Sequence, residues 1–111
     1  KNYGNDQQQM YRMILSAVNK AIRQTGIKRV IPSGVAIQNA RKTMGDVLNR
    51  DGFHLQLTYG RYTAACTWCE FLTGKNVVGN PYKPSTIDDH TARLAQEAAH
   101  KAMKMNHILF K

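Results

Sequence analysis

One short β-branched segment, Ile27 to Pro32, constrains the fold of this chain more than any other feature. Its sequence, Ile-Lys-Arg-Val-Ile-Pro, is followed by Ser-Gly, and this composition is typical of a buried strand that ends in a turn. A strand buried without neighbours would leave N–H and C=O groups unpaired on both sides, at a cost of about 1–3 kcal/mol each. We therefore expect further strands beside this segment, so that the chain forms one edge of a larger parallel sheet.

The remaining periodic segments are predicted to be helical. Helices are expected over residues 6–25, 35–43, 61–72 and 85–103. The first carries apolar residues at three- and four-residue steps and ends before Gly26, a natural C-terminal cap. The last begins with Ser85 as cap and Asp88 three residues later, and its apolar face is rich in alanine. Because helices alternate with the strand, the pattern predicts an α/β layer fold.

The composition fits one globular unit over residues 1–111, since 42% hydrophobic residues can build a core. The net charge of +9 would attract nucleic acid or anionic lipid if it were concentrated on one face. Lysines and arginines instead stand singly or in pairs such as Lys28-Arg29, so we expect solvated faces and no nucleic-acid partner. No apolar stretch approaches the roughly 18 residues of a membrane span. Localisation is left open, because a segment upstream of Lys1 could carry a signal peptide for secretion or periplasmic export.

The segment Asp51-Gly52-Phe53-His54 carries the most suggestive chemistry. An aspartate three residues before a histidine, with a glycine that lets the backbone turn, can bring its carboxylate to the imidazole Nδ1–H. This contact fixes the tautomer and leaves Nε2 free as a general base toward a serine hydroxyl. The four residues alone favour another interpretation, in which Asp51 caps a turn and His54 is a surface histidine, because an Asp-x-x-His match occurs often by chance.

A longer string around this segment resembles the final catalytic block of the SGNH (GDSL-type) serine hydrolases, closest to a poorly characterised bacterial branch. It consists of Gly45-Asp-Val-Leu-Asn-Arg-Asp-Gly-Phe-His-Leu, then Gly60-Arg-Tyr-Thr-Ala-Ala-Cys and Leu72-Thr-Gly. The resemblance implies the C-terminal portion of a three-layer α/β/α, flavodoxin-like fold, mostly helical here with about one parallel strand. It also implies that Asp51 orients His54, the base of the triad. Leu55 stands where many members have proline.

The resemblance implies hydrolysis of an ester, such as an acyl group on a carbohydrate, without metal or organic cofactor. The family's Gly-Asp-Ser or Gly-Asn-Ser nucleophile block is absent. Ser33 lacks the Gly-x-Ser-x-Gly elbow and is more typical of a turn or cap, while Ser16 lies within the first expected helix. We therefore expect an N-terminal part of the hydrolase domain, outside this chain, to supply the serine and to be this segment's partner.

Other reactive residues have structural interpretations. Cys66 and Cys69 lie within an apolar expected helix and have no second ligand pair, so we expect buried free thiols and no metal site. Trp68 and Tyr62 are expected to pack rather than to bind substrate. The histidines of the last helix and tail, His90, His100 and His107, are expected to be exposed.

Two further interpretations of function stay open. The chain could be a basic helical module that binds nucleic acid or another anionic partner, for which the charge of +9 is the sole argument. It could also be an inactive relic of a hydrolase that is retained as an interaction domain.

Overall fold

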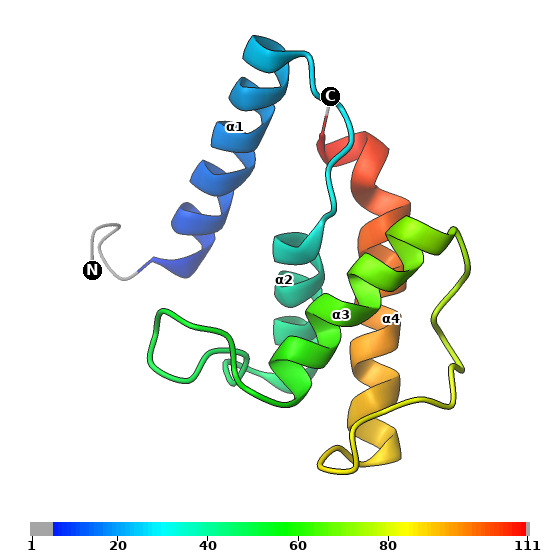
Figure 1. Ribbon diagram of the computed structural model, residues 1–111. Coiled ribbons are helices and arrows are strands. Elements are labelled where there is room, and N and C mark those ends of the chain that lie inside the picture. Colours follow the sequence, from blue (N-terminus) through cyan, green and yellow to red (C-terminus); the bar gives the residue numbers. More distant parts are fainter. Residues whose placement is uncertain (1–5, 111) are drawn as a thin grey trace. The chain divides into compact units, whose positions relative to one another are not determined.

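The computed structural model describes residues 6–110 and contains four α-helices in that range (Figure 1). They are α1 (Gln7–Thr25), α2 (Ser33–Met44), α3 (Tyr59–Thr73) and α4 (Asp89–Leu109). Local sequence sets most of their ends. Asp6 caps α1 by accepting a hydrogen bond from the Gln9 N–H at 3.0 Å, and Gly26 ends it in the left-handed conformation at φ 75°.

The predicted α/β/α fold with a parallel strand is wrong, because residues 6–110 contain no strand. The segment expected to be that strand lies in an irregular connection between α1 and α2. Ile27 at its start is 65% exposed, so water can satisfy the backbone that a buried strand would have to pair. β-branched residues favour an extended backbone, which explains why the segment resembled a strand. Neighbouring strands were inferred only because the segment was expected to be buried, and the segment before Pro32 is not buried.

The described chain divides into two compact units, the first of which consists of residues 6–30 and 106–110. Two asparagine side chains tie α1 and the connection after it to the end of α4. Asn19 Nδ2 donates to the Leu109 carbonyl at 2.8 Å, and Asn106 Nδ2 donates to the Val30 carbonyl at 3.0 Å. This unit therefore closes through side-chain to backbone bonds between residues far apart in sequence.

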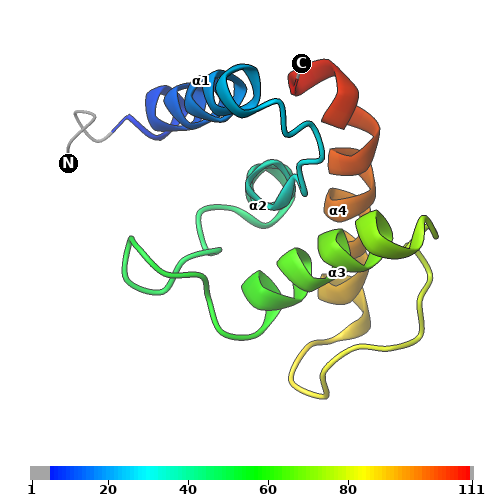
Figure 2. The same ribbon diagram turned by 45° about the horizontal axis from the view of Figure 1, so that its top comes forward.

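The second unit, residues 31–105, contains α2, α3 and most of α4. Figures 1 and 2 show α2 and α3 lying against α4. The burial predicted for one alanine-rich face of the last helix is confirmed at Ala95, Ala98 and Ala102. Ala95 packs in one cluster with Tyr62 of α3 and with Ala99, which the prediction had not placed on that face. Ala98 packs in a second cluster with Ala40 of α2 and Leu48. Small alanine side chains let the helices approach closely. The segment that follows α2 is held in the same packing through Leu48.

The bounds of α2, α3 and α4 differ from the sequence predictions, and α3 begins at Tyr59, two residues earlier than expected. Helix α2 begins at Ser33, two residues earlier than expected. Ser85 does not cap α4, because it lies in a turn, and Asp88 Oδ1 instead accepts the Thr91 N–H at 2.7 Å. The helix also continues to Leu109, since no glycine or proline follows Met103 to stop it.

Candidate active site

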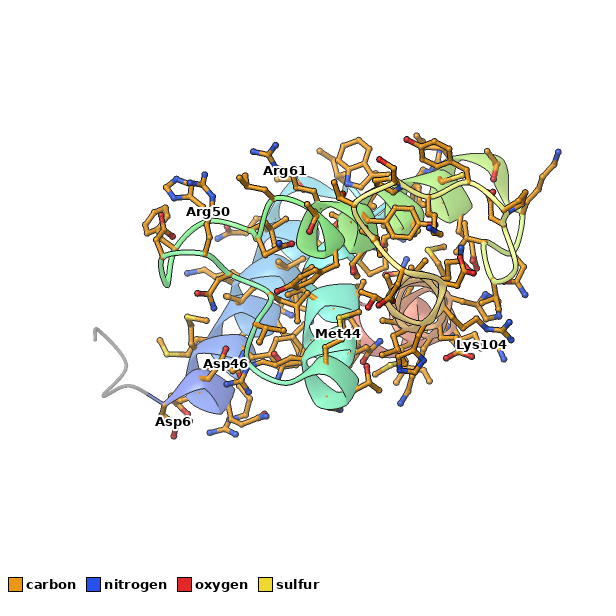
Figure 3. The ribbon with its side chains drawn as sticks, turned by 90° about the horizontal axis from the view of Figure 1, so that it is seen from below. Asp6, Met44, Asp46, Arg50, Arg61 and Lys104 are labelled. Carbon is orange, nitrogen blue, oxygen red and sulfur yellow. The ribbon has the colours of Figure 1, made fainter. Side chains whose placement is uncertain are left out.

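The loop between α2 and α3 folds back on itself as a short hairpin. Asn49 and Leu55 form an isolated antiparallel bridge, and the Arg50 N–H donates to the His54 carbonyl at 3.0 Å. At the tip, Asn49 Oδ1 accepts the Gly52 N–H at 2.8 Å, and Gly52 adopts φ 77°. That left-handed conformation favours glycine, so the sequence specifies the turn locally. Figure 3 shows the labelled Arg50 side chain on this loop, and its Nε donates to the Leu55 carbonyl at 3.2 Å.

One carboxylate organises the tip of this hairpin. Asp51 Oδ1 accepts the backbone N–H of Phe53 at 2.9 Å and that of His54 at 2.7 Å. Its other oxygen, Oδ2, lies 2.8 Å from Nδ1 of the His54 imidazole. The contact expected from the spacing of these two residues is therefore present, and the same aspartate also caps the turn. This arrangement shows the turn cap of one sequence interpretation and is compatible with the catalytic role of the other.

The electrostatics of the pair favour an ionised aspartate. The backbone N–H of His54, then the His54 side chain and the Phe53 N–H, lower the pKa of the Asp51 carboxyl well below its usual range. A carboxylate at Nδ1 favours the tautomer that carries its proton there, which leaves a lone pair on Nε2. The two side chains are about half exposed, so Nε2 is accessible to a reacting group.

The hairpin is held to the body of the second unit at its base. Leu48 is buried in the cluster with Ala98, and its carbonyl accepts the Gln56 N–H at 2.8 Å. Gln56 Oε1 accepts the Gly60 N–H at 3.0 Å and so caps the start of α3. A Cβ on Gly60 would lie 3.0 Å from the Leu48 carbonyl oxygen, a tight contact that a larger residue could make only if the neighbouring backbone shifted by a few tenths of an ångström. The dyad, defined as Asp51 and His54, is thus displayed on an anchored loop.

A nucleophile for the dyad is not found in the second unit. Ser33 is the first residue of α2 and Ser85 lies in the turn before α4, and neither is hydrogen-bonded to His54. One depression of about 300 Å³ lies nearby on this unit, but its lining does not include the dyad. The lining residues are Met44, Val47, Tyr59, Thr91 and Leu94.

A second carboxylate–imidazole pair was missed by the sequence prediction. His100 Nδ1 lies 2.7 Å from Glu70 Oε2, and Glu70 Oε1 accepts the Val77 N–H at 3.1 Å. The expectation that His100 is simply exposed is therefore wrong. A useful signal was present, because Glu70 is the single charged residue in the stretch from Tyr62 to Thr73.

Gln96 of α4 organises the long connection before that helix. Its Nε2 donates to the Tyr62 hydroxyl at 2.9 Å and to the Asn80 carbonyl at 3.0 Å, while its Oε1 accepts the Gly79 N–H at 3.0 Å. The Tyr62 hydroxyl in turn donates to the Tyr82 carbonyl at 2.7 Å. All of these partners belong to the protein scaffold, so the network accounts for the buried Tyr62 as a structural residue, as expected.

The cysteines differ in environment. Cys66 is buried as expected, but the prediction of burial is wrong for Cys69, which is exposed. Burial raises the pKa of the Cys66 thiol to about 11. Among residues 6–110 no group of three or more His, Cys, Asp or Glu side chains is arranged to hold a metal ion. Within the same residues, no helix has the length and apolar character needed to cross a membrane.

Fold and site together define a helical domain that displays a carboxylate–imidazole pair on a hairpin. The chain belongs to the DUF4886 family, a domain of unknown function, whose model matches residues 1–102. It is similar to a DUF4886 family protein of known crystal structure from Bacteroides uniformis, with a TM-score of 0.89 and 57% sequence identity. That match covers 93% of this chain and 40% of the solved chain, so this chain spans less than half the length of its relative. No curated protein matches the sequence.

Proposed function

We propose that Asp51 and His54 are the acid and base of a serine-dependent ester hydrolase of the SGNH type. The observation that carries the proposal is the 2.8 Å contact between Asp51 Oδ2 and His54 Nδ1, together with an accessible Nε2. In a serine hydrolase the carboxylate holds the imidazole in this tautomer and stabilises the imidazolium that forms during the reaction.

The nucleophilic serine is proposed to lie outside the described residues. The larger part of the solved relative's chain lies beyond the match, which leaves ample length for a nucleophile and oxyanion donors. A hairpin that exposes both dyad side chains by about half is suited to meeting such a partner. The resemblance around Asn49 to Gly74 supports the same division of the triad between two parts of one polypeptide.

The reaction follows from these roles. His54 Nε2 takes the serine proton as the serine oxygen bonds to the ester carbonyl carbon. The bond between that carbon and the alcohol oxygen then breaks, and the imidazolium returns its proton to the departing alcohol. Water repeats the sequence on the acyl-serine and releases the acid. The substrate class is an ester, for example an acylated carbohydrate.

A fluorophosphonate probe tests the proposal, because it labels only an activated serine. The full-length polypeptide that contains this chain should be labelled and should hydrolyse p-nitrophenyl acetate. The 111-residue chain alone should not be labelled, and its hydrolysis rate should not exceed that of free imidazole at equal concentration. Absence of labelling in the full-length polypeptide would reject the proposal, and labelling of Ser33 in the isolated chain would place the nucleophile inside it.

A further inference from the structure

Phe53 lies between Asp51 and His54 in the sequence, and it is 86% exposed. Its ring centroid is 4.9 Å from that of the His54 imidazole, with the planes tilted by 49°. Among the large apolar side chains described as exposed, that of Phe53 is the most exposed, so its whole apolar surface is available to a ligand.

The hairpin does not require an aromatic side chain at this position. Phe53 contributes to the turn through its backbone N–H, which donates to Asp51 Oδ1 at 2.9 Å. Any residue other than proline can make that bond. The turn fixes the direction in which the Phe53 side chain projects, but it does not require a phenylalanine at this position.

The chemistry of the neighbouring imidazole indicates what the ring can contact. In the acylation step the proton on Nε2 passes to the oxygen of the leaving alcohol, so that oxygen must lie within hydrogen-bonding distance of the imidazole. Groups attached to the alcohol carbon then extend over the surface around His54, where the Phe53 ring lies. In this arrangement the acyl group, bonded to the serine, is taken to extend away from the ring.

We propose that Phe53 binds the alcohol portion of the ester substrate through an apolar face, and that it sets specificity for that portion. The inference rests on the proposed function, because it uses His54 as the proton donor to the leaving group. The alcohol portion must present an apolar surface to the Phe53 ring. Either a hydrocarbon chain or the C–H face of a sugar ring can supply such a surface. Phe53 is a specificity-determining residue that takes no part in proton transfer.

The test compares the wild-type full-length polypeptide with the Phe53→Ala and Phe53→Leu variants, and with Leu72→Ala as a matched control. Leu72 is also an exposed apolar residue, at the far end of α3. One series holds acetate constant and varies the alcohol among ethanol, hexanol and a methyl glucoside. The other holds ethanol constant and lengthens the acid. The ratio kcat/KM reports acylation only, and it separates the two portions of the ester.

Phe53→Ala should lower kcat/KM about tenfold for the large alcohols, equivalent to about 1.4 kcal/mol, and leave ethyl esters of every acid unchanged. Phe53→Leu should restore activity on hexyl acetate. Restored activity on the acetylated glucoside as well would show that a flat aromatic face is not needed for the sugar. Equal losses in the two series would overturn the inference, as would a uniform loss accompanied by a lower melting temperature, which marks a packing residue. Failure of the wild type to hydrolyse any ester would instead reject the proposed function, and the inference with it.

Discussion

His100 Nδ1 lies 2.7 Å from Glu70 Oε2 in a contact that joins α4 to α3. The groups are the same as in the pair formed by Asp51 and His54, but the burial differs. The side chain of Glu70 is 9% exposed, whereas that of Asp51 is 44% exposed. Removing either carboxylate should therefore have different consequences for stability.

Replacement of Glu70 by alanine should destabilise the protein by about 1–3 kcal/mol, because it leaves the buried Val77 N–H without its acceptor. Glu70→Gln, which keeps an oxygen for that N–H, should cost less. Asp51→Ala should cost less than Glu70→Ala, since the partners of Asp51 are exposed and can bond to water instead. Thermal unfolding followed by circular dichroism measures all three variants. Equal losses for Glu70→Ala and Asp51→Ala would contradict the structural role assigned to Glu70.

The two cysteines should react at very different rates with a disulfide reagent such as DTNB. With a pKa of about 11, only about 0.1% of Cys66 is thiolate at pH 8, and burial further blocks access. Cys69 is exposed and should account for the fast phase. Cys69→Ser should therefore remove that phase, while Cys66→Ser should retain it. Two equal fast phases in the native protein would show that the environment of Cys66 has been misjudged.

Local sequence predicted the features that are determined locally. The Asp6 and Gly26 caps of α1, the bulk of α3 and the turn at Gly52 each depend on residues within a few positions. The contact of Asp51 with His54 belongs to this group, since three residues separate them. Periodicity likewise identified the alanine face of α4, because burial of one helical face leaves a pattern in the sequence.

Long-range features were not predictable in the same way. Glu70 and His100 are 30 residues apart, and only packing of α3 on α4 brings them together. The prediction of a strand from Ile27 to Pro32 was wrong for a related reason. A strand needs a neighbouring strand to pair with, and residues 6–110 contain none. At α4, Ser85 was predicted as the cap, but the Ile87 N–H donates to the Pro84 carbonyl in a turn, and Asp88 caps the helix instead.

The pKa of Asp51 should be measurably low in the 111-residue chain. Because the folded state lowers it, the carboxylate stays ionised as the pH falls through about 4, and the stability that its bonds contribute is lost only below that range. His54→Ala should raise the pKa only partly, since the backbone N–H groups of residues 53 and 54 remain as donors. Titration of the side-chain carboxyl carbon by NMR follows both. A normal pKa for Asp51 in the wild type would contradict the described hydrogen bonds.

The central claim is that His54 is the base of a serine hydrolase, and ester hydrolysis by full-length His54→Ala tests it most directly. Loss of a triad base should reduce kcat/KM at least about a thousandfold, and Asp51→Asn about as severely through the wrong tautomer. The matched control is His107→Ala, which removes an exposed histidine that lies on α4 and not in the hairpin. This variant should keep the wild-type rate. Melting temperatures should agree among all four proteins, since the dyad makes few packing contacts. A His54→Ala protein that hydrolyses esters at the wild-type rate would contradict the catalytic assignment.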